Sequence, residues 1–277
     1  ERVMDTPLTE SMIVGVAVGA AVNGLRPVAE IQFADFIFPA FNQLQSQVAR
    51  MRYRTNGDVG LPLVIRAPFG GGVHGGLYHS QSVEAFFTHI PGLKVVVPST
   101  PLDARGLLRS AIRDPDPVLY LEHKKLYRSV RGEVPDTDFV TPLGSAAITR
   151  PGTQLTVLAY GLMAHHALDA AARAEEEGVS VEVVDLRSLR PLDTETVLNS
   201  VRKTGKCLIV HEDNRFGGYG AELAALIAEE AFEYLDGPVT RVCGPDVPAV
   251  PYSHVLEDWF MVNPDKILAG IRKLAAY

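Results

Sequence analysis

Cysteine is scarce in this 277-residue sequence, and long apolar runs are missing. The two cysteines, Cys207 and Cys243, are too few for a disulfide framework or a zinc cluster, and their scarcity favours a reducing compartment. The longest nearly continuous apolar run, residues 12–22, is shorter than the ~20 residues that cross a bilayer, so we expect no membrane partner. We also expect no signal peptide, because the sequence opens on charged residues.

Basic residues are outnumbered, with 26 Lys and Arg against 33 Asp and Glu and a formal net charge of −7. Nucleic-acid-binding domains present a basic surface, so we expect no nucleic-acid partner. The sequence also lacks a P-loop, a nucleophile elbow and a zinc motif, and the glycines at 217, 218 and 220 do not have G-x-G-x-x-G spacing.

Alternation of strand-like and helix-like segments is the main pattern present. It predicts an α/β fold of two domains, each a mostly parallel sheet covered by helices on both faces. Charges, prolines and glycine break the pattern after residue 124, so we predict a domain at 1–130, a linker at 131–152 and a second domain at 153–277. The expected strands are 27–33, 61–68, 93–98, 117–123, 155–160, 181–186, 207–212 and 239–244, and the expected helices are 10–23, 38–54, 82–88, 101–113, 163–177, 194–203 and 220–235.

Glu10 stands at the mouth of a run of small apolar residues. It fits the first turn of a helix capped by Thr9, where a carboxylate interacts favourably with the helix dipole. It equally fits a carboxyl group in an apolar surround, with a raised pKa, that shares a proton with a ligand nitrogen. The two interpretations are compatible.

Aromatic residues and histidines gather in two neighbouring segments. The segment QFADFIFPAFNQ is either core or, on an irregular stretch, a flat platform for a planar ligand. The glycine-rich stretch APFGGGVHGGLYHSQS is an ordered loop whose His74 and His79 are either structural or suited to proton transfer. A metal role for these histidines lacks an evident third ligand.

Two further segments are open to a bland or a functional interpretation. The acidic turn IRDPDPV is either a solvated connection or a source of oxygen ligands for a hard cation. The segment HEDNRFGGYGAE follows a buried strand and precedes a helix, which is where open α/β sheets place ligands and partners.

Several of these stretches together resemble one family. DTPLTE, GVAVGAAVNGLRPVAEIQFADF, GGLYHSQSVEAFFTHIPGLKVVVPSTPLDARGLL, VVDLRSLRPLD and HEDNRFGGYGAE resemble the beta subunit of thiamine-diphosphate-dependent 2-oxo acid dehydrogenases over essentially the whole chain. The resemblance implies a transketolase-like pyrimidine-binding domain, a transketolase C-terminal-like domain and an N-terminally shortened chain.

The resemblance also implies roles for single residues. Glu10 matches the glutamate that contacts the aminopyrimidine ring of thiamine diphosphate, Phe36 matches the aromatic residue that stacks on this ring, and Leu8 belongs to the same cofactor-binding set. His79 matches the histidine that assists proton transfer near the reacting carbon. Glu10 and His79 are thus the catalytic candidates.

A potassium site is implied as well. It matches the main-chain region around Leu61 and Leu63, together with Ala111, Asp114 and Asp116. Asp116 and the proline before it differ from the residues expected in some relatives.

The resemblance further implies partners. The 277 residues contain no GDG motif, through which the family holds the cofactor's diphosphate and Mg²⁺. We therefore expect a shared site with an alpha subunit in an α2β2 heterotetramer, a second beta subunit as neighbour, and a lipoyl-bearing acyltransferase docked on the second domain. The location would be cytoplasmic in a bacterium and the mitochondrial matrix in a eukaryote.

The sequence leaves more than one substrate class and activity open. The stretches VHGGLYHSQS and RMRYR resemble the branched-chain type more than the pyruvate type, so the resemblance implies a branched-chain 2-oxo acid, with a pyruvate or acetoin dehydrogenase as the alternative. A transketolase-like half-enzyme and a non-enzymatic electron-carrier or scaffolding subunit are further alternatives.

Overall fold

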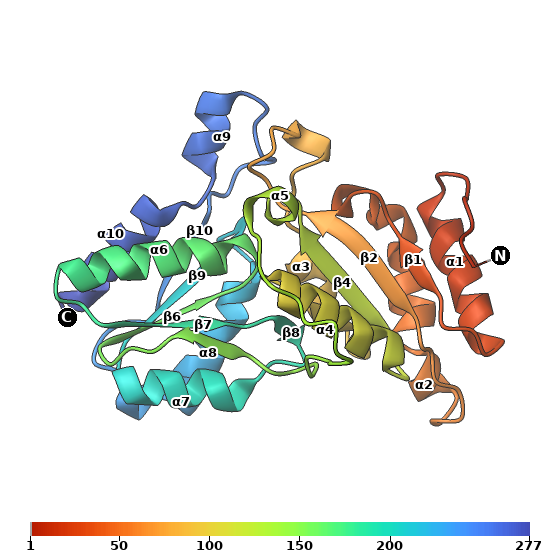
Figure 1. Cartoon of the computed structure of the whole chain (residues 1–277), viewed down its shortest axis with the longest axis horizontal. Helices are drawn as coiled ribbons and strands as arrows, with labels where there is room; N and C mark the ends of the chain where they lie inside the picture. The colour runs from red at the N-terminus through yellow and green to blue at the C-terminus, as the bar shows by residue number, and fades with distance from the viewer. Residues whose placement is uncertain (1) are drawn as a thin grey trace.

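The computed structural model describes residues 2–277, which form two five-stranded sheets lying side by side (Figure 1). The strands are β1 (Val28–Glu30), β2 (Val64–Phe69), β3 (Lys94–Val96), β4 (Val118–His123), β5 (Ala147–Arg150), β6 (Leu155–Ala159), β7 (Val181–Asp185), β8 (Ser188–Arg190), β9 (Cys207–Asn214) and β10 (Thr240–Gly244). The sheet orders are β1-β2-β4-β3-β8 and β10-β9-β6-β7-β5. Among these strands only the β3–β8 and β5–β7 pairs are antiparallel, so the predicted α/β class with mostly parallel sheets is confirmed.

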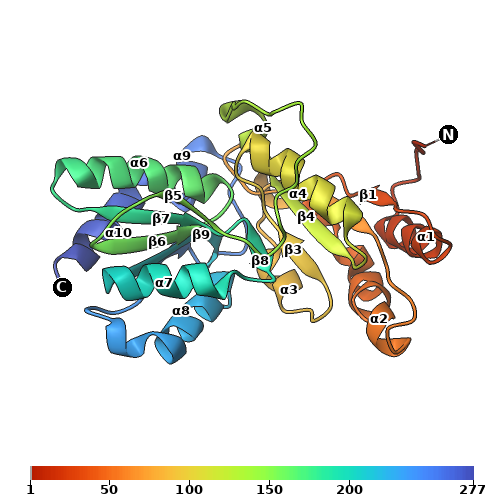
Figure 2. The same ribbon diagram turned by 60° about the horizontal axis from the view of Figure 1, so that its bottom comes forward.

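Helices cover both faces of each sheet. They are α1 (Glu10–Val22), α2 (Met51–Arg54), α3 (Glu84–Thr88), α4 (Pro101–Arg113), α5 (Leu126–Ser129), α6 (Leu162–Glu176), α7 (Thr194–Thr204), α8 (Tyr219–Glu230), α9 (His254–Phe260) and α10 (Pro264–Ala275). Helices α6 and α10 lie on one face of the second sheet, and α7 and α8 lie on the other (Figure 2). Every residue of β6 and β7 is buried, as expected for strands covered on both sides.

The prediction of one continuous helix over 38–54 is wrong. After the short turn η1 (Ala34–Phe36), this stretch consists of a second short turn, η2 (Phe38–Ala40), a π-helical segment, η3 (Gln43–Val48), and α2. Pro39 lies in the first turn of η2, where its missing N–H is tolerated. The irregular backbone keeps the aromatic side chains of 33–41 near the first sheet's edge.

The two domains are joined by more than a connecting loop. Strand β5 lies inside the range 131–152 that the sequence predicted as linker, and it pairs with β7 at the edge of the second sheet. Strand β8, which follows β7, returns to the first sheet and pairs with β3. One continuous apolar core also contains buried residues of both sheets, among them Ile65, Leu158 and Val184. The second domain is therefore packed firmly enough to place its own side chains against loops of the first.

No helix within residues 2–277 is long and apolar enough to cross a membrane.

Candidate active site

The residues predicted for catalysis and cofactor binding lie on segments at the carboxyl edge of the first sheet. A connection of only five residues joins α1 to β1, so α1 runs back along the strand and its amino end, with Glu10, lies toward that edge (Figure 1). The glycine-rich loop leaves β2 at the same edge, because β1 and β2 are parallel. Open α/β sheets bind ligands at this edge.

Glu10 occupies the first turn of α1, as the sequence predicted. The Thr9 side chain makes no capping hydrogen bond, and the helix instead begins with the Thr9 carbonyl accepting from the amides of Met12 and Ile13. Glu10 is half-buried, and within residues 2–277 its carboxylate makes no hydrogen bond or ion pair. A carboxyl group so placed can accept a proton from a ligand, or donate one to it, without first breaking a contact within the protein.

Phe36 and His79, which the sequence places 43 positions apart, lie together. Their ring centroids are 5.4 Å apart, and Phe33 packs edge-on against both, at 5.9 Å from Phe36 and 4.6 Å from His79. Phe33 and Phe36 are partly exposed, so this is not a sealed core. Leu8, by contrast, is 70% exposed.

The glycine-rich loop is ordered, as predicted, and includes the short turn η4 (Gly76–Tyr78). At its base the Gly70 amide donates to the Gln81 carbonyl at 3.0 Å. The Gln81 amide donates to the Asp35 carboxylate at 3.2 Å, which ties the loop to the aromatic segment. His79 is therefore fixed from both sides.

Two charged residues beside this cluster were missed at the sequence level. The Lys124 Nζ lies 5.5 Å from the Phe33 ring centroid and has no hydrogen-bond partner among residues 2–277. Burial lowers the pKa of Lys124 to about 8, and burial also raises the pKa of Asp35. The sequence shows Lys124 only as one of two lysines after a strand, with no signal for its position.

Glu212 and Glu257 of the second domain also reach this site. Glu212 pairs with His123 at the end of β4, with 2.8 Å between Oε2 and Nε2, and Glu257 contacts His74 in the glycine-rich loop. Glu212 lies in the segment 211–222 that the sequence marked as a ligand or partner region, whereas no pattern singled out Glu257. In the described part of the chain, no group of three His, Cys, Asp or Glu side chains is arranged to hold a metal ion.

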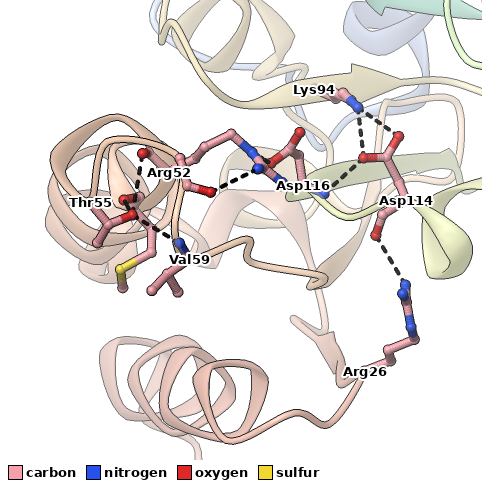
Figure 3. Close-up of polar contacts among 9 residues, drawn as sticks. Arg26, Arg52, Thr55, Val59, Lys94, Asp114 and Asp116 are labelled. Atoms are coloured by element: carbon pink, nitrogen blue, oxygen red, sulfur yellow. Dashed lines mark hydrogen bonds and ion pairs between the residues drawn. The ribbon is translucent and has the colours of Figure 1, made fainter.

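Three of the five residues predicted for potassium lie where α4 ends: Ala111 in its last turn, Asp114 at its C-cap and Asp116 two positions beyond. Leu61 and Leu63 lie just before β2. Figure 3 shows that both carboxylates there are paired: Lys94 contacts both oxygens of Asp114, at 2.6 and 2.7 Å, and Arg52 contacts Asp116. Arg26 donates to the main-chain carbonyls of Ile112 and Asp114, at 2.8 and 3.1 Å. The carboxylates are therefore neutralised by the chain's own cations.

One main-chain oxygen of this corner does fit a cation. In α4 the carbonyl of Ala111 would normally accept the amide of residue 115, which is proline and has no N–H. The Leu63 carbonyl accepts from Val118 and keeps a second lone pair. Neutral carbonyl oxygens at a helix carboxyl end suit a weakly hydrated monovalent cation better than paired carboxylates do.

Comparison with known families places both halves of the chain. The model of the transketolase pyrimidine-binding domain matches residues 1–130, and that of the transketolase C-terminal domain matches residues 144–267. Among solved structures, a split-gene transketolase described as an inactive beta4 tetramer superposes with a TM-score of 0.77 at 28% identity, over 96% of this chain and 81% of that one.

Full-length relatives give a narrower answer. The chain is 56% identical over 277 residues to the 2-oxoisovalerate dehydrogenase subunit beta of Bacillus subtilis, covering all of this chain and 85% of that protein. It is 46% identical to the Pseudomonas aeruginosa protein of the same name, over 99% of this chain and 81% of that one, and 47% identical to the pyruvate dehydrogenase E1 component subunit beta of B. subtilis, over 100% and 85%. The chain belongs to the family of beta subunits of thiamine-diphosphate-dependent 2-oxo acid dehydrogenases.

Proposed function

We propose that this chain is the beta subunit of a branched-chain 2-oxo acid dehydrogenase, which decarboxylates the acid oxidatively and passes the acyl group to a lipoyl-bearing acyltransferase. The margin of 56% identity to a 2-oxoisovalerate dehydrogenase beta subunit over 47% to a pyruvate dehydrogenase beta subunit of the same organism carries the substrate choice. The juxtaposition of Phe36 and His79 at the carboxyl edge supports the site assignment.

The residues present fit thiamine diphosphate through its pyrimidine half. A partly exposed Phe36 ring offers a surface for a planar heterocycle, and the unpaired Glu10 carboxylate can hold a hydrogen bond to a ring nitrogen. When bound, this cofactor would supply a carbanion to attack the 2-oxo carbon and a positively charged ring to accept the electron pair as CO₂ leaves. Leu8 stays a proposed member of the binding set, and its exposure leaves it available for contact with cofactor or partner.

Glu10 and His79 serve two different proton transfers in this proposal. Glu10 exchanges a proton with a nitrogen of the pyrimidine ring and thereby controls the protonation state of that ring. His79, braced by the rings of Phe33 and Phe36, moves a proton at the reacting centre or at the lipoyl acceptor.

An alpha subunit completes the site in this proposal, within an α2β2 assembly that also contains a second beta subunit and docks the acyltransferase through the second domain. The 277 residues hold no GDG motif for the diphosphate and its Mg²⁺. Helix α1 also exposes apolar side chains, with Val16 at 58% and Val22 at 48%, which is typical of a face that another chain covers. We expect the cytoplasm as its location in a bacterium and the mitochondrial matrix in a eukaryote.

Reconstitution tests the proposed function. Mixed with an alpha subunit, the chain should oxidise 2-oxoisovalerate with a higher kcat/KM than pyruvate or acetoin, and alone it should bind thiamine diphosphate weakly by calorimetry. Equal or better turnover of pyruvate would overturn the substrate choice, and tight cofactor binding by the isolated chain would overturn the shared site.

We also propose a potassium ion at the carboxyl end of α4, within the set Leu61, Leu63, Ala111, Asp114 and Asp116, with the main-chain oxygens of Leu63 and Ala111 as ligands. The Ala111 carbonyl, deprived of its helical donor by a proline, supports this placement. At equal ionic strength KCl should raise the Tm above its value in choline chloride by mass action, and Pro115→Ala, which restores an N–H, should reduce the difference. The same Tm in both salts would contradict the site.

A further inference from the structure

We propose that Glu212 and Glu257 of the second domain are positioning residues for His79, because their carboxylates hold the backbone of the glycine-rich loop that ends on this histidine. The inference rests on the role proposed above for His79. It concerns two side chains that lie in the other domain and face the loop's backbone.

Glu212 anchors the start of the loop. It is 3% exposed, and its Oε1 accepts from the Gly71 amide at 2.6 Å and from the Ser82 hydroxyl at 3.3 Å. Its Oε2 contacts His123 Nε2 at 2.8 Å. Burial alone would raise the pKa of Glu212, but His123, the Gly71 amide and the nearby Lys124 charge together hold this pKa below its usual value. The carboxylate is thus kept ionised, which makes it a strong acceptor for a backbone amide.

Glu257 anchors the next turn of the loop. It lies in α9, is 1% exposed, and accepts from the Gly72 amide at 2.9 Å and from the His74 amide at 3.3 Å. Its second oxygen contacts His74 Nδ1, and the His74 ring lies against the His254 ring, tilted by 51° with centroids 3.7 Å apart. The two carboxylates together therefore hold the loop amides of residues 71, 72 and 74.

The backbone conformation explains why the loop needs anchors. Gly70, Gly72 and Gly76 have φ of +88°, +75° and +65°, and His74, which is not glycine, has φ +58°. A glycine-rich segment loses much conformational entropy when it is fixed, and a positive φ at a histidine adds strain. Hydrogen bonds that the loop amides donate to buried carboxylates offset these costs and select one loop conformation.

The part of the loop that the two glutamates hold, residues 71–74, is next to the part that carries His79. A Cβ atom added to Gly75 would lie 2.8 Å from the His79 Cβ and 2.8 Å from its carbonyl oxygen, so the backbone at 75 packs directly on His79. The Gly70 amide also bonds the Gln81 carbonyl, two residues beyond the histidine. A shift of the 71–74 backbone therefore displaces the His79 ring relative to Phe33 and Phe36.

A double-mutant cycle tests the inference in the enzyme assembled with its alpha subunit, thiamine diphosphate and Mg²⁺. The variants are Glu257→Ala, His79→Ala and the pair, with Asp258→Asn as matched control, since Asp258 is the exposed carboxylate next along α9. Lipoyl-dependent turnover and decarboxylation with an artificial electron acceptor are measured separately, together with KM for the 2-oxo acid.

We expect Glu257→Ala to lower lipoyl-dependent kcat about tenfold or more, because a misplacement of about 1 Å at a reacting group has effects of this size. The ratio of its losses in the two assays should equal that of His79→Ala, and its KM for the 2-oxo acid should stay within about twofold of wild type. Added to His79→Ala, it should lower kcat by less than about twofold further. Asp258→Asn should behave as wild type.

Two outcomes separate the claims. A loss from Glu257→Ala that is equally large with and without His79 would overturn the positioning role and leave the proposed function intact. Unimpaired turnover of His79→Ala would overturn the role proposed for His79 and this inference with it. If Glu257→Ala does not assemble, Glu257→Gln takes its place. Its amide oxygen still accepts from the loop, so we expect a smaller loss that again disappears in the His79→Ala background, and a loss equal in both backgrounds contradicts the inference.

Discussion

Gly70 provides a sharp test of how the two domains meet at the site. Its φ is +88°, and a Cβ added there would lie 2.2 Å from the His123 Nε2. Gly70→Ala therefore strains the backbone and pushes His123 away from Glu212. A matched control exists in Gly24, whose φ is +91° but whose added Cβ would meet no heavy atom within 4 Å.

The expected magnitudes differ clearly. An alanine at positive φ costs about 1–2 kcal/mol, which is all that Gly24→Ala should lose. Disrupting the buried contact between His123 and Glu212 costs about 3–5 kcal/mol more, so Gly70→Ala should lose about 4–7 kcal/mol. At roughly 2–4 °C per kcal/mol, the Tm should fall by about 8–28 °C for Gly70→Ala and by at most about 8 °C for Gly24→Ala.

Thermal unfolding followed by circular dichroism at one fixed scan rate measures both shifts. Equal Tm shifts for the two variants would refute the reasoning, because they would show that the His123–Glu212 contact adds nothing beyond backbone strain.

Two more predictions concern the cofactor site and pH. Phe36→Ala should weaken thiamine diphosphate binding to the assembled enzyme at least about tenfold by calorimetry, while Phe38→Ala, whose ring packs on Phe86 with centroids 5.3 Å apart, should not; equal affinities would contradict the stacking role. Burial raises the pKa of Asp185 to about 7, so the stability that its proton contributes is present below about pH 4 and is lost as the pH rises through 7. In urea unfolding, the stability of Asp185→Asn relative to wild type should therefore increase by about 2–3 kcal/mol as the pH rises from 5 to 8. A stability difference that does not change with pH would contradict this assignment.

The sheets were predictable because buried parallel strands consist almost wholly of apolar residues. Strands such as LTVLA and VEVVD are legible from composition alone. Strands β5 and β8 were not predicted because β5 has no fully buried residue and β8 has only three residues. Helix α10 was also not predicted, although Asn263 caps it by accepting from the Lys266 amide and proline follows at the first helical position.

The candidate site was predictable only in part. Glu10, Phe36 and His79 lie in local patterns that carry a chemical signal of their own. Glu212 and Glu257 contribute through contacts 141 and 185 positions away, with Gly71 and Gly72. Such long-range pairs depend on how β9 and α9 pack against the first domain, which no local pattern encodes.

The central claim is that Glu10 acts on the cofactor in a site completed by an alpha subunit. Its most direct test is the rate of CO₂ release from 2-oxoisovalerate by the reconstituted enzyme carrying Glu10→Gln. We expect assembly and Tm to be unchanged and the rate to fall by at least about a hundredfold, as for loss of a general acid or base. A rate equal to wild type would contradict the account.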